Sequence, residues 1–239
     1  MNQILVTEKL YITPELKRKK RIFKIEFFLS VFLVCLLSSY YIYAEYNRNE
    51  SEQVSKQILS EMNSDSTIKK ADNNDVMVIM VDGEQQEEIV NTTETVNEVP
   101  SSYTSSDGTN YSIDSRIRIP SICIEYPVLS ETSDRLLEIS VNKYWGPNGA
   151  NEIGNYCIVG HNYRNGKMFG RLHELVNGDT VELEDLMGRK ITYKVYNKYV
   201  VKPTDTRCTS QKTNGKKELT LITCTNYGKE RLIVKCRQV

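Results

Sequence analysis

The chain has 239 residues, which is enough for one ordinary domain with extensions and too short for several large domains. Lys and Arg total 31 and Asp and Glu also total 31, so the formal net charge is zero. The charges are nevertheless segregated, with a net of +4 over residues 1–44, −10 over residues 45–111 and +6 over residues 112–239. The modest +6 is not accompanied by a repeat of aromatic and basic residues, which argues against a nucleic-acid-binding protein.

The first segment has the pattern of a basic tail followed by a membrane anchor. Five consecutive basic residues at 17–21 precede an apolar stretch at 22–44, which has about the 20 residues that a membrane-spanning helix needs. Because the basic cluster comes first, we expect residues 1–21 to stay in the cytoplasm and the rest of the chain to be extracellular. A cleaved signal peptide is the alternative, but its apolar region is normally about 7–15 residues long.

Residues 45–111 are predicted to be an acidic, largely disordered extracellular spacer. They are rich in Ser, Thr, Asn, Asp and Glu and poor in aromatic residues, so they cannot bury enough apolar area to fold. Two parts differ from the rest. Residues 51–62 are expected to form a short helix, and residues 76–81 are an apolar hexamer of high β-propensity that could pair with the folded domain or with another protein.

From residue 112 onward the sequence changes to short apolar runs separated by turn residues, which predicts a mostly β domain, either a barrel or a sandwich. Residues 133–142 are expected to form a short helix, residues 168–175 a helical turn, and residues 144–149 a loop. The predicted strands are 116–119, 122–129, 153–159, 179–183, 190–201, 219–224 and 231–237.

The last two predicted strands should form an antiparallel hairpin in which Cys224 lies opposite Arg231. The same register pairs Ile222 with Ile233 and Thr220 with Lys235. Alternation along the strands then turns the other face, which is almost wholly apolar, toward the core. The thiol and the guanidinium would share the open face, within reach of one substrate. The alternative is an ordinary hairpin with a core cysteine and a rim arginine.

His161 favours the functional interpretation. It follows Gly160, which allows close backbone approach, and it stands where an apolar strand meets a loop, a common place for functional residues. A cysteine, a histidine and an arginine at strand ends supply a candidate nucleophile, a general acid and base, and a group that stabilises an oxyanion. His173, on the polar side of its helical turn, is expected to be a surface residue without a role.

The other cysteines are expected to be structural. Outside the predicted membrane span there are five cysteines, an odd number, so at least one thiol is free or paired between molecules. We expect Cys123, Cys157 and Cys236 to be buried, because each lies in an apolar run, whereas Cys208 receives no assignment. There is no Cys-x-x-Cys motif and no metal-spaced histidine pair, so we predict neither a metal site nor a cofactor.

Four segments carry a family resemblance. Residues 116–129 (RIRIPSICIEYPVL), 149–162 (GANEIGNYCIVGHN), 166–175 (GKMFGRLHEL) and 220–234 (TLITCTNYGKERLIV) resemble the sortases of Gram-positive bacteria. The resemblance covers roughly residues 112–239, and the anchor and spacer before it fit the usual layout of that family.

The resemblance implies a closed eight-stranded β-barrel with one or two short helices, preceded by a single transmembrane helix and a polar spacer. It also implies a cysteine transpeptidase of the thiol protease type, which cuts a Leu-Pro-x-Thr-Gly-like sorting signal through a thioacyl intermediate. The matching positions are Cys224 as nucleophile, His161 as general acid and base, and Arg231 for the oxyanion, with Thr223 and Asn162 as substrate-binding residues. The implied partners are surface proteins that carry the signal and an amine acceptor, such as a peptidoglycan precursor.

Two questions stay open at this point. The His161 region is similar to class B sortases, whereas the Cys224 region is closer to classes C, D or E, so the subclass and the sorting signal are not assigned. Two other functions are compatible with the same residues: a thiol peptidase that cuts without transfer, and a non-catalytic barrel that binds peptides or cell wall.

Overall fold

The structure is a computed structural model that describes residues 14–71, 101–105 and 108–239, with side chains omitted at 64–71. The predicted apolar hexamer at 76–81 lies outside the described residues. The chain divides into two compact units, one up to Asn49 and one from Glu50 to the end, and each is described by itself.

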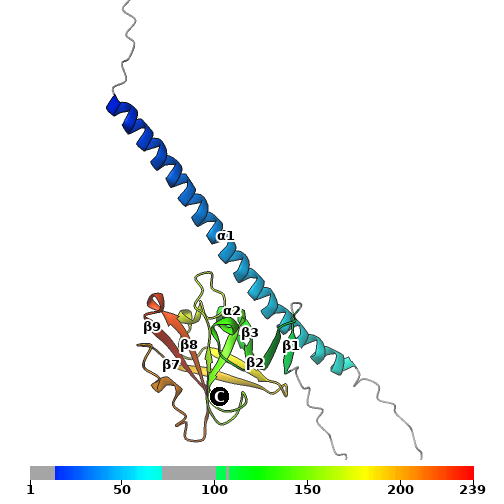
Figure 1. Cartoon of the computed structure of the whole chain (residues 1–239). Coiled ribbons are helices and arrows are strands. Elements are labelled where there is room, and N and C mark those ends of the chain that lie inside the picture. The colour runs from blue at the N-terminus through cyan, green and yellow to red at the C-terminus, as the bar shows by residue number, and fades with distance from the viewer. Residues whose placement is uncertain (1–13, 72–100, 106–107) are drawn as a thin grey trace, which may run out of the picture. The chain divides into compact units, whose positions relative to one another are not determined.

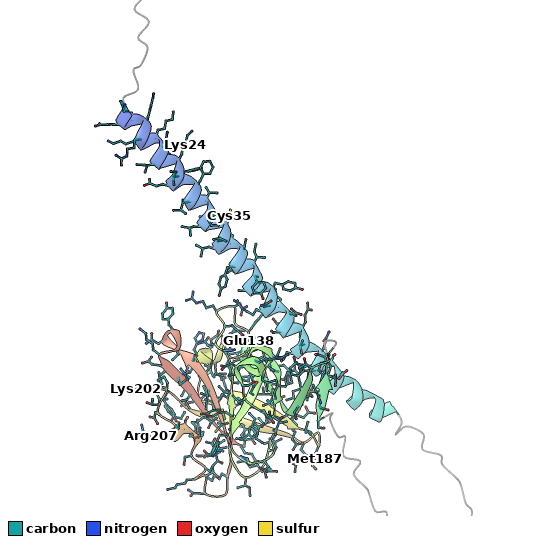
Figure 2. The ribbon with its side chains drawn as sticks, in the orientation of Figure 1. Lys24, Cys35, Glu138, Met187, Lys202 and Arg207 are labelled. Carbon is teal, nitrogen blue, oxygen red and sulfur yellow. The ribbon has the colours of Figure 1, made fainter. Side chains whose placement is uncertain are left out.

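A single helix, α1 (Pro14–Ala71), supplies the described part of the first unit. Its apolar side chains before Asn49 are exposed, with Phe28 at 67% and Leu37 at 68%. Lys24 and Cys35 mark this stretch in Figure 2. By length and composition α1 could cross a membrane, and it is the one helix among the described residues that could.

The second unit is a closed β-barrel, shown in Figure 1. Its eight strands follow the order β2-β3-β4-β5-β8-β9-β7-β6, and a pairing of β2 with β6 closes the ring. A short ninth strand, β1, adds to the start of β2. The strands are β1 (Ser102–Thr104), β2 (Asn110–Ile119), β3 (Ile124–Leu129), β4 (Val141–Trp145), β5 (Gly154–Val159), β6 (Thr180–Asp185), β7 (Lys190–Val201), β8 (Lys217–Thr225) and β9 (Glu230–Gln238).

The predicted fold class is therefore confirmed, since the closed eight-stranded barrel carries only a few short helical segments. They are α2 (Asp134–Ile139), which Ser133 caps, and the 3₁₀ turns η2 (Pro120–Ile122), η3 (Leu172–Glu174), η4 (Arg207–Thr209) and η5 (Asn226–Gly228). One local expectation was wrong: Tyr144 and Trp145 end strand β4 instead of belonging to a loop. They do so because Trp145 pairs with Cys157 of β5 across an irregularity in the register.

Alternation along the strands decides which side chains fill the barrel. In β2, Ile117 and Ile119 are completely buried. Arg116 and Arg118, which alternate with them, face outward. Arg116 forms an ion pair with Glu184 of β6, and Arg118 forms one with Glu182 of the same strand. This period of two, continued around the ring, produces one large apolar core inside the barrel.

A second apolar cluster joins α1 to the barrel within the second unit. Ile58 and Met62 of α1 are buried together with Tyr111, Leu129 and Ile139 of the barrel domain. The helix that we expected at residues 51–62 is therefore present. It packs on the domain, in a range where we had expected mostly unfolded spacer.

Candidate active site

The hairpin of β8 and β9 has the register predicted from the sequence. Cys224 pairs with Arg231, Ile222 with Ile233, and Thr220 with Lys235. The opposite face is buried in the barrel core, as expected: its members are Leu219, Leu221, Leu232, Val234 and Cys236. Cys224 and Arg231 are half-buried at the loop end of the outer face, so a thiol and a guanidinium lie side by side where solvent can reach them.

Strand β5 brings His161 to the same position. It runs parallel to β8, with Val159 level with Ile222, and the amide of Gly160 donates to the carbonyl of Ile222 at 3.1 Å. Continuing this register by two residues makes His161 level with Cys224. The side-chain amide of Asn162 donates to the carbonyl oxygen of Cys224 at 2.7 Å, which holds the two segments together beyond the last ladder pair.

Gly160 is required at its position because there is no room for a side chain. A Cβ atom there would lie 2.7 Å from Cγ1 of Val141 and 2.9 Å from Cδ2 of Phe169, and both of these residues are fully buried. The close approach expected from the sequence is thus present. It fixes the backbone immediately before His161 against the core.

The two predicted substrate-binding residues have different surroundings. Thr223 lies on the core face, as the alternation along the hairpin predicted, and its hydroxyl donates to the carbonyl of Gly160 at 2.7 Å. Alternation along β8 causes this, because Thr223 must point opposite to its neighbour Cys224. Asn162 remains exposed beside Cys224, and its amide is already engaged with the Cys224 carbonyl.

His161 lies in a partly apolar environment. Burial lowers the pKa of its imidazole, while the nearby carboxylates of Glu138 and Asp134 on α2 oppose that effect by raising it. The ring of Tyr163 is tilted by 45° against the imidazole, with 5.2 Å between the ring centroids. A lowered pKa leaves His161 neutral at neutral pH, so the ring can accept a proton from a thiol.

Arg231 is held by backbone groups. Its Nη1 donates to the carbonyls of Gly228 at 2.9 Å and of Glu230 at 3.0 Å. Among the described residues, no carboxylate lies within ion-pair distance of this guanidinium. Its remaining donors are therefore available to a negatively charged oxygen that develops near Cys224.

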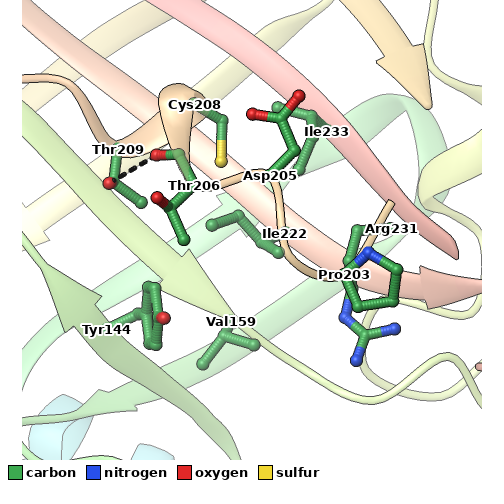
Figure 3. Close-up of a pocket in the computed structure, with 10 residues that line it drawn as sticks. All are labelled: Tyr144, Val159, Pro203, Asp205, Thr206, Cys208, Thr209, Ile222, Arg231 and Ile233. Carbon is green, nitrogen blue, oxygen red and sulfur yellow. Dashed lines mark hydrogen bonds between the residues drawn. The ribbon is translucent and has the colours of Figure 1, made fainter. Parts of the chain in front are cut away.

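An apolar groove of about 240 Å³ leads away from this end of the barrel. Val159, Ile222 and Ile233 contribute to it from three adjacent strands, and Tyr144 adds an aromatic ring from β4. Figure 3 shows Arg231 at one end of the group, with Cys208 and Thr209 at the other. The remaining wall comes from the loop after β7, which Lys202 and Arg207 mark in Figure 2.

Two buried polar side chains hold that loop in place. Lys235 Nζ donates to Oγ1 of Thr220 at 2.8 Å and to the carbonyl of Cys208 at 3.2 Å. Asn155 Nδ2 donates to the same Cys208 carbonyl at 2.9 Å. Sequence reasoning paired Lys235 with Thr220 but assigned no role to Lys235, Asn155 or the loop. The feature of the sequence that could have indicated this role is Lys235 itself, a lysine on the outer face of an otherwise apolar strand.

Three of the four remaining cysteines of the barrel domain are buried, and the fourth, Cys123, is exposed. Cys157 and Cys236 are fully buried as expected, and burial raises the pKa of each thiol to about 12. Cys208, unassigned before, is also buried, and burial raises its pKa. The expectation for Cys123 was wrong: it is exposed, because it ends η2 with a left-handed backbone (φ 53°) that turns it away from the core.

His173 is exposed, as the sequence suggested, and its Nδ1 lies 3.1 Å from the carbonyl of Gly170. Within the described ranges, no group of three or more His, Cys, Asp or Glu side chains is arranged to hold a metal ion.

Three comparisons show which known proteins the chain is similar to. The sortase domain model matches residues 117–239. Sortase A of Bacillus anthracis is 31% identical over 115 residues, which are 46% of this chain and 50% of that protein, so the match spans half the length of this curated relative. Among solved structures, the Sortase D5 transpeptidase of Clostridium perfringens is 25% identical, with 54% of this chain and 79% of that chain covered and a TM-score of 0.49. Sortase C-1 of Actinomyces oris is 30% identical, with coverages of 53% and 73% and a TM-score of 0.49.

Proposed function

Because the chain belongs to the sortase family, we propose that it is a membrane-anchored cysteine transpeptidase that cuts a Leu-Pro-x-Thr-Gly-like sorting signal. The observation that carries the proposal is the convergence of Cys224, His161 and Arg231 at one end of one barrel face, beside an apolar groove.

The acylation step uses each of the three groups. Neutral His161 takes the proton of the Cys224 thiol, and the thiolate forms a bond to the carbonyl carbon of the signal's threonine. Arg231 stabilises the oxyanion that develops on the carbonyl oxygen. The carbon–nitrogen bond then breaks, the leaving amine takes the proton from the His161 imidazolium, and a thioester on Cys224 remains.

The second step returns the enzyme to its starting state. An amine acceptor attacks the thioester carbon and gives its proton to His161, and the carbon–sulfur bond breaks to release the Cys224 thiolate. The His161 imidazolium then returns its proton to the thiolate, which restores the thiol and the neutral imidazole. A new amide then joins the surface protein to the acceptor. We propose a cell-wall amine, such as that of a peptidoglycan precursor, as the acceptor.

The proposed location follows from the N-terminal part of the chain. Residues 1–21 would form a cytoplasmic tail, residues 22–44 a single membrane span, residues 45–111 an extracellular spacer and residues 112–239 the catalytic domain. The apolar, exposed surface of α1 before Asn49 and the basic cluster that precedes it support this arrangement.

The function is tested with the full chain in detergent, mixed with peptides carrying Leu-Pro-x-Thr-Gly-like sequences and with several amines. Mass spectrometry should detect a shortened peptide joined to one amine, and no product with the variant Cys224→Ala. Cleavage that never yields an amide, whatever the amine, would replace the transpeptidase with a thiol peptidase. The absence of cleavage and of a thioester adduct for every peptide would contradict catalysis.

A further inference from the structure

A second hollow with exposed aromatic side chains adjoins the groove. Its lining includes Glu131, Lys143 and Trp145, and Tyr144 lines both this hollow and the groove. Tyr144 is 47% exposed and Trp145 is 59% exposed, so both rings present large apolar faces to solvent. The two cavities therefore adjoin at Tyr144, with Arg231 in the lining of the first and Trp145 in the lining of the second.

The strand register gives the position of Trp145 along the strand direction relative to the candidate nucleophile; β4 itself lies two strands away from β8. Trp145 pairs with Cys157, and Cys157 pairs with Thr220 of β8. Thr220 precedes Cys224 by four residues on the same face of the strand. At about 3.3 Å per residue, Trp145 is therefore level with a point about 13 Å back along β8 from Cys224.

We propose that Tyr144 and Trp145 form a binding site for the peptide segment immediately before the sorting signal in the surface-protein substrate. This rests on the proposed function, in which the N-terminal part of the cleaved protein stays bound to Cys224 as a thioester. That part must be held on the enzyme until the acceptor arrives, and the groove is lined by Arg231, the strand partner of Cys224. With the threonine carbonyl at Cys224, an extended peptide that runs back along β8 makes the residue just before the leucine level with Trp145, which reaches toward the groove from β4.

The side chains that line this site determine which peptide residues it would bind. Exposed indole and phenol rings favour an aromatic or proline side chain that stacks on them. Glu131 adds a carboxylate to the same hollow, which favours a lysine or arginine next to the stacked residue. The structure thus assigns specificity for residues upstream of the signal to β4.

Trp145 is the only tryptophan of the chain, so its fluorescence reports on this site directly. The full-length Cys224→Ala variant in detergent is titrated with a capped Leu-Pro-x-Thr-Gly-like pentapeptide that the parent enzyme cleaves. The same titration uses this peptide extended upstream by Ser-Lys-Tyr. We expect the extended peptide to shift the emission of Trp145 and to bind about three- to tenfold more tightly.

A kinetic measurement uses the enzyme with Cys224 intact. The ratio of kcat/KM for the extended peptide to that for the pentapeptide should exceed one, and should fall to about one in Trp145→Ala. Trp145→Phe should keep most of the gain because it keeps an aromatic face. The control is Met187→Ala. Met187 is an exposed apolar residue on the turn between β6 and β7 and is labelled in Figure 2, and its replacement should leave the kcat/KM ratio as in the parent enzyme.

Cleavage of both peptides with equal kcat/KM and no emission change would overturn the proposed site and leave the proposed function intact. An emission shift caused by a muropeptide acceptor, and not by the extended peptide, would overturn it in favour of an acceptor site. If the parent enzyme cleaves no Leu-Pro-x-Thr-Gly-like peptide, with or without the upstream extension, the proposed function is contradicted, and the proposed site with it.

Discussion

The side-chain amide of Asn162 donates a hydrogen bond to the carbonyl oxygen of Cys224 over 2.7 Å. A second bond, from the Thr223 hydroxyl to the carbonyl of Gly160, crosses the same pair of segments in the opposite direction. His161 therefore lies between two residues that hydrogen-bond to β8, and the partners on β8 are Cys224 itself and its neighbour Thr223. The candidate base and nucleophile are aligned by these bonds as well as by the ladder between β5 and β8.

Replacing Cys224 with alanine should abolish both cleavage and transfer, with a loss of at least about a thousandfold in kcat, because the thioester cannot form. The fold should be unchanged, since the side chain is only half-buried. The measurement is mass spectrometry of the peptide products and of the thioester adduct. Cys123→Ala removes an exposed thiol in another part of the domain and serves as the control. Transfer that survives in Cys224→Ala would exclude this cysteine as the nucleophile.

Arg231→Ala should lower kcat by about 10²–10³-fold, the usual effect of removing one oxyanion donor. Arg231→Lys should recover only part of the activity, because an ammonium keeps the charge and loses the planar fork of donors. Steady-state kinetics of peptide cleavage measure both variants. Arg118→Ala, a half-exposed arginine of β2 that pairs with Glu182, should behave like the parent enzyme. Equal activity of the alanine and lysine variants would contradict a role for the guanidinium geometry.

His161 should titrate below pH 6.5, because burial lowers the pKa of its imidazole more than the α2 carboxylates raise it. Protonation is then less favourable in the folded state, so this group contributes stability above pH 6.5 that is lost as the pH falls below that value. Imidazole NMR signals measured against pH test this, and with only two histidines the variant His173→Gln assigns them. Glu138→Gln should lower the midpoint further. A midpoint above 6.5 in the parent protein would refute the expectation.

Ile58→Ala should lower the free energy of unfolding by about 2–5 kcal/mol, because the side chain is completely buried between α1 and the barrel. Urea unfolding of the full chain, followed by the fluorescence of Trp145, provides the measurement. Gln53→Ala changes an exposed residue of the same helix and should have little effect. If both substitutions had the same small effect, residues 50–63 would not be an integral part of the folded domain.

Lys235→Met should loosen the wall of the groove. It keeps most of the side-chain volume but removes the ammonium that donates to Thr220 and to the Cys208 carbonyl, at a cost in stability of about 1–3 kcal/mol. We expect KM for the peptide to rise about three- to tenfold, with a smaller change in kcat. Lys194→Met, at an exposed position of β7, is the matched control. A fall in kcat at constant KM would instead place the effect at Cys224 itself.

Several features could be predicted without the structure because they depend on neighbouring residues. The register between β8 and β9 follows from alternation and a short connection, so it placed Cys224 opposite Arg231 correctly. The same reasoning gave the buried face of that hairpin. The close approach at Gly160 was expected for a separate reason, because glycine has no side chain. The closed barrel was expected from the family resemblance, while the strand pattern alone left a barrel and a sandwich equally open.

Other features depend on contacts between distant parts of the chain. Nothing near Cys123 in the sequence shows that a left-handed turn exposes it, and nothing near Ile58 shows that it packs against Tyr111 and Ile139. Alternation along β8 predicted the face on which Thr223 lies. It could not predict that the Thr223 hydroxyl donates to the carbonyl of Gly160, because that residue is 63 positions away in the sequence.

The sequence by itself determined the candidate reactive groups of this protein, the hairpin that joins two of them, and the apolar helix near the N-terminus. These are local properties, fixed by residue type and by the period of two along a strand. Only the tertiary structure decided that β5 lies parallel to β8, which brings His161 level with Cys224, and that β4 adds Tyr144 and Trp145 to the same face. Parallel pairing joins strands separated by long connections, so its register depends on the packing of the whole barrel core.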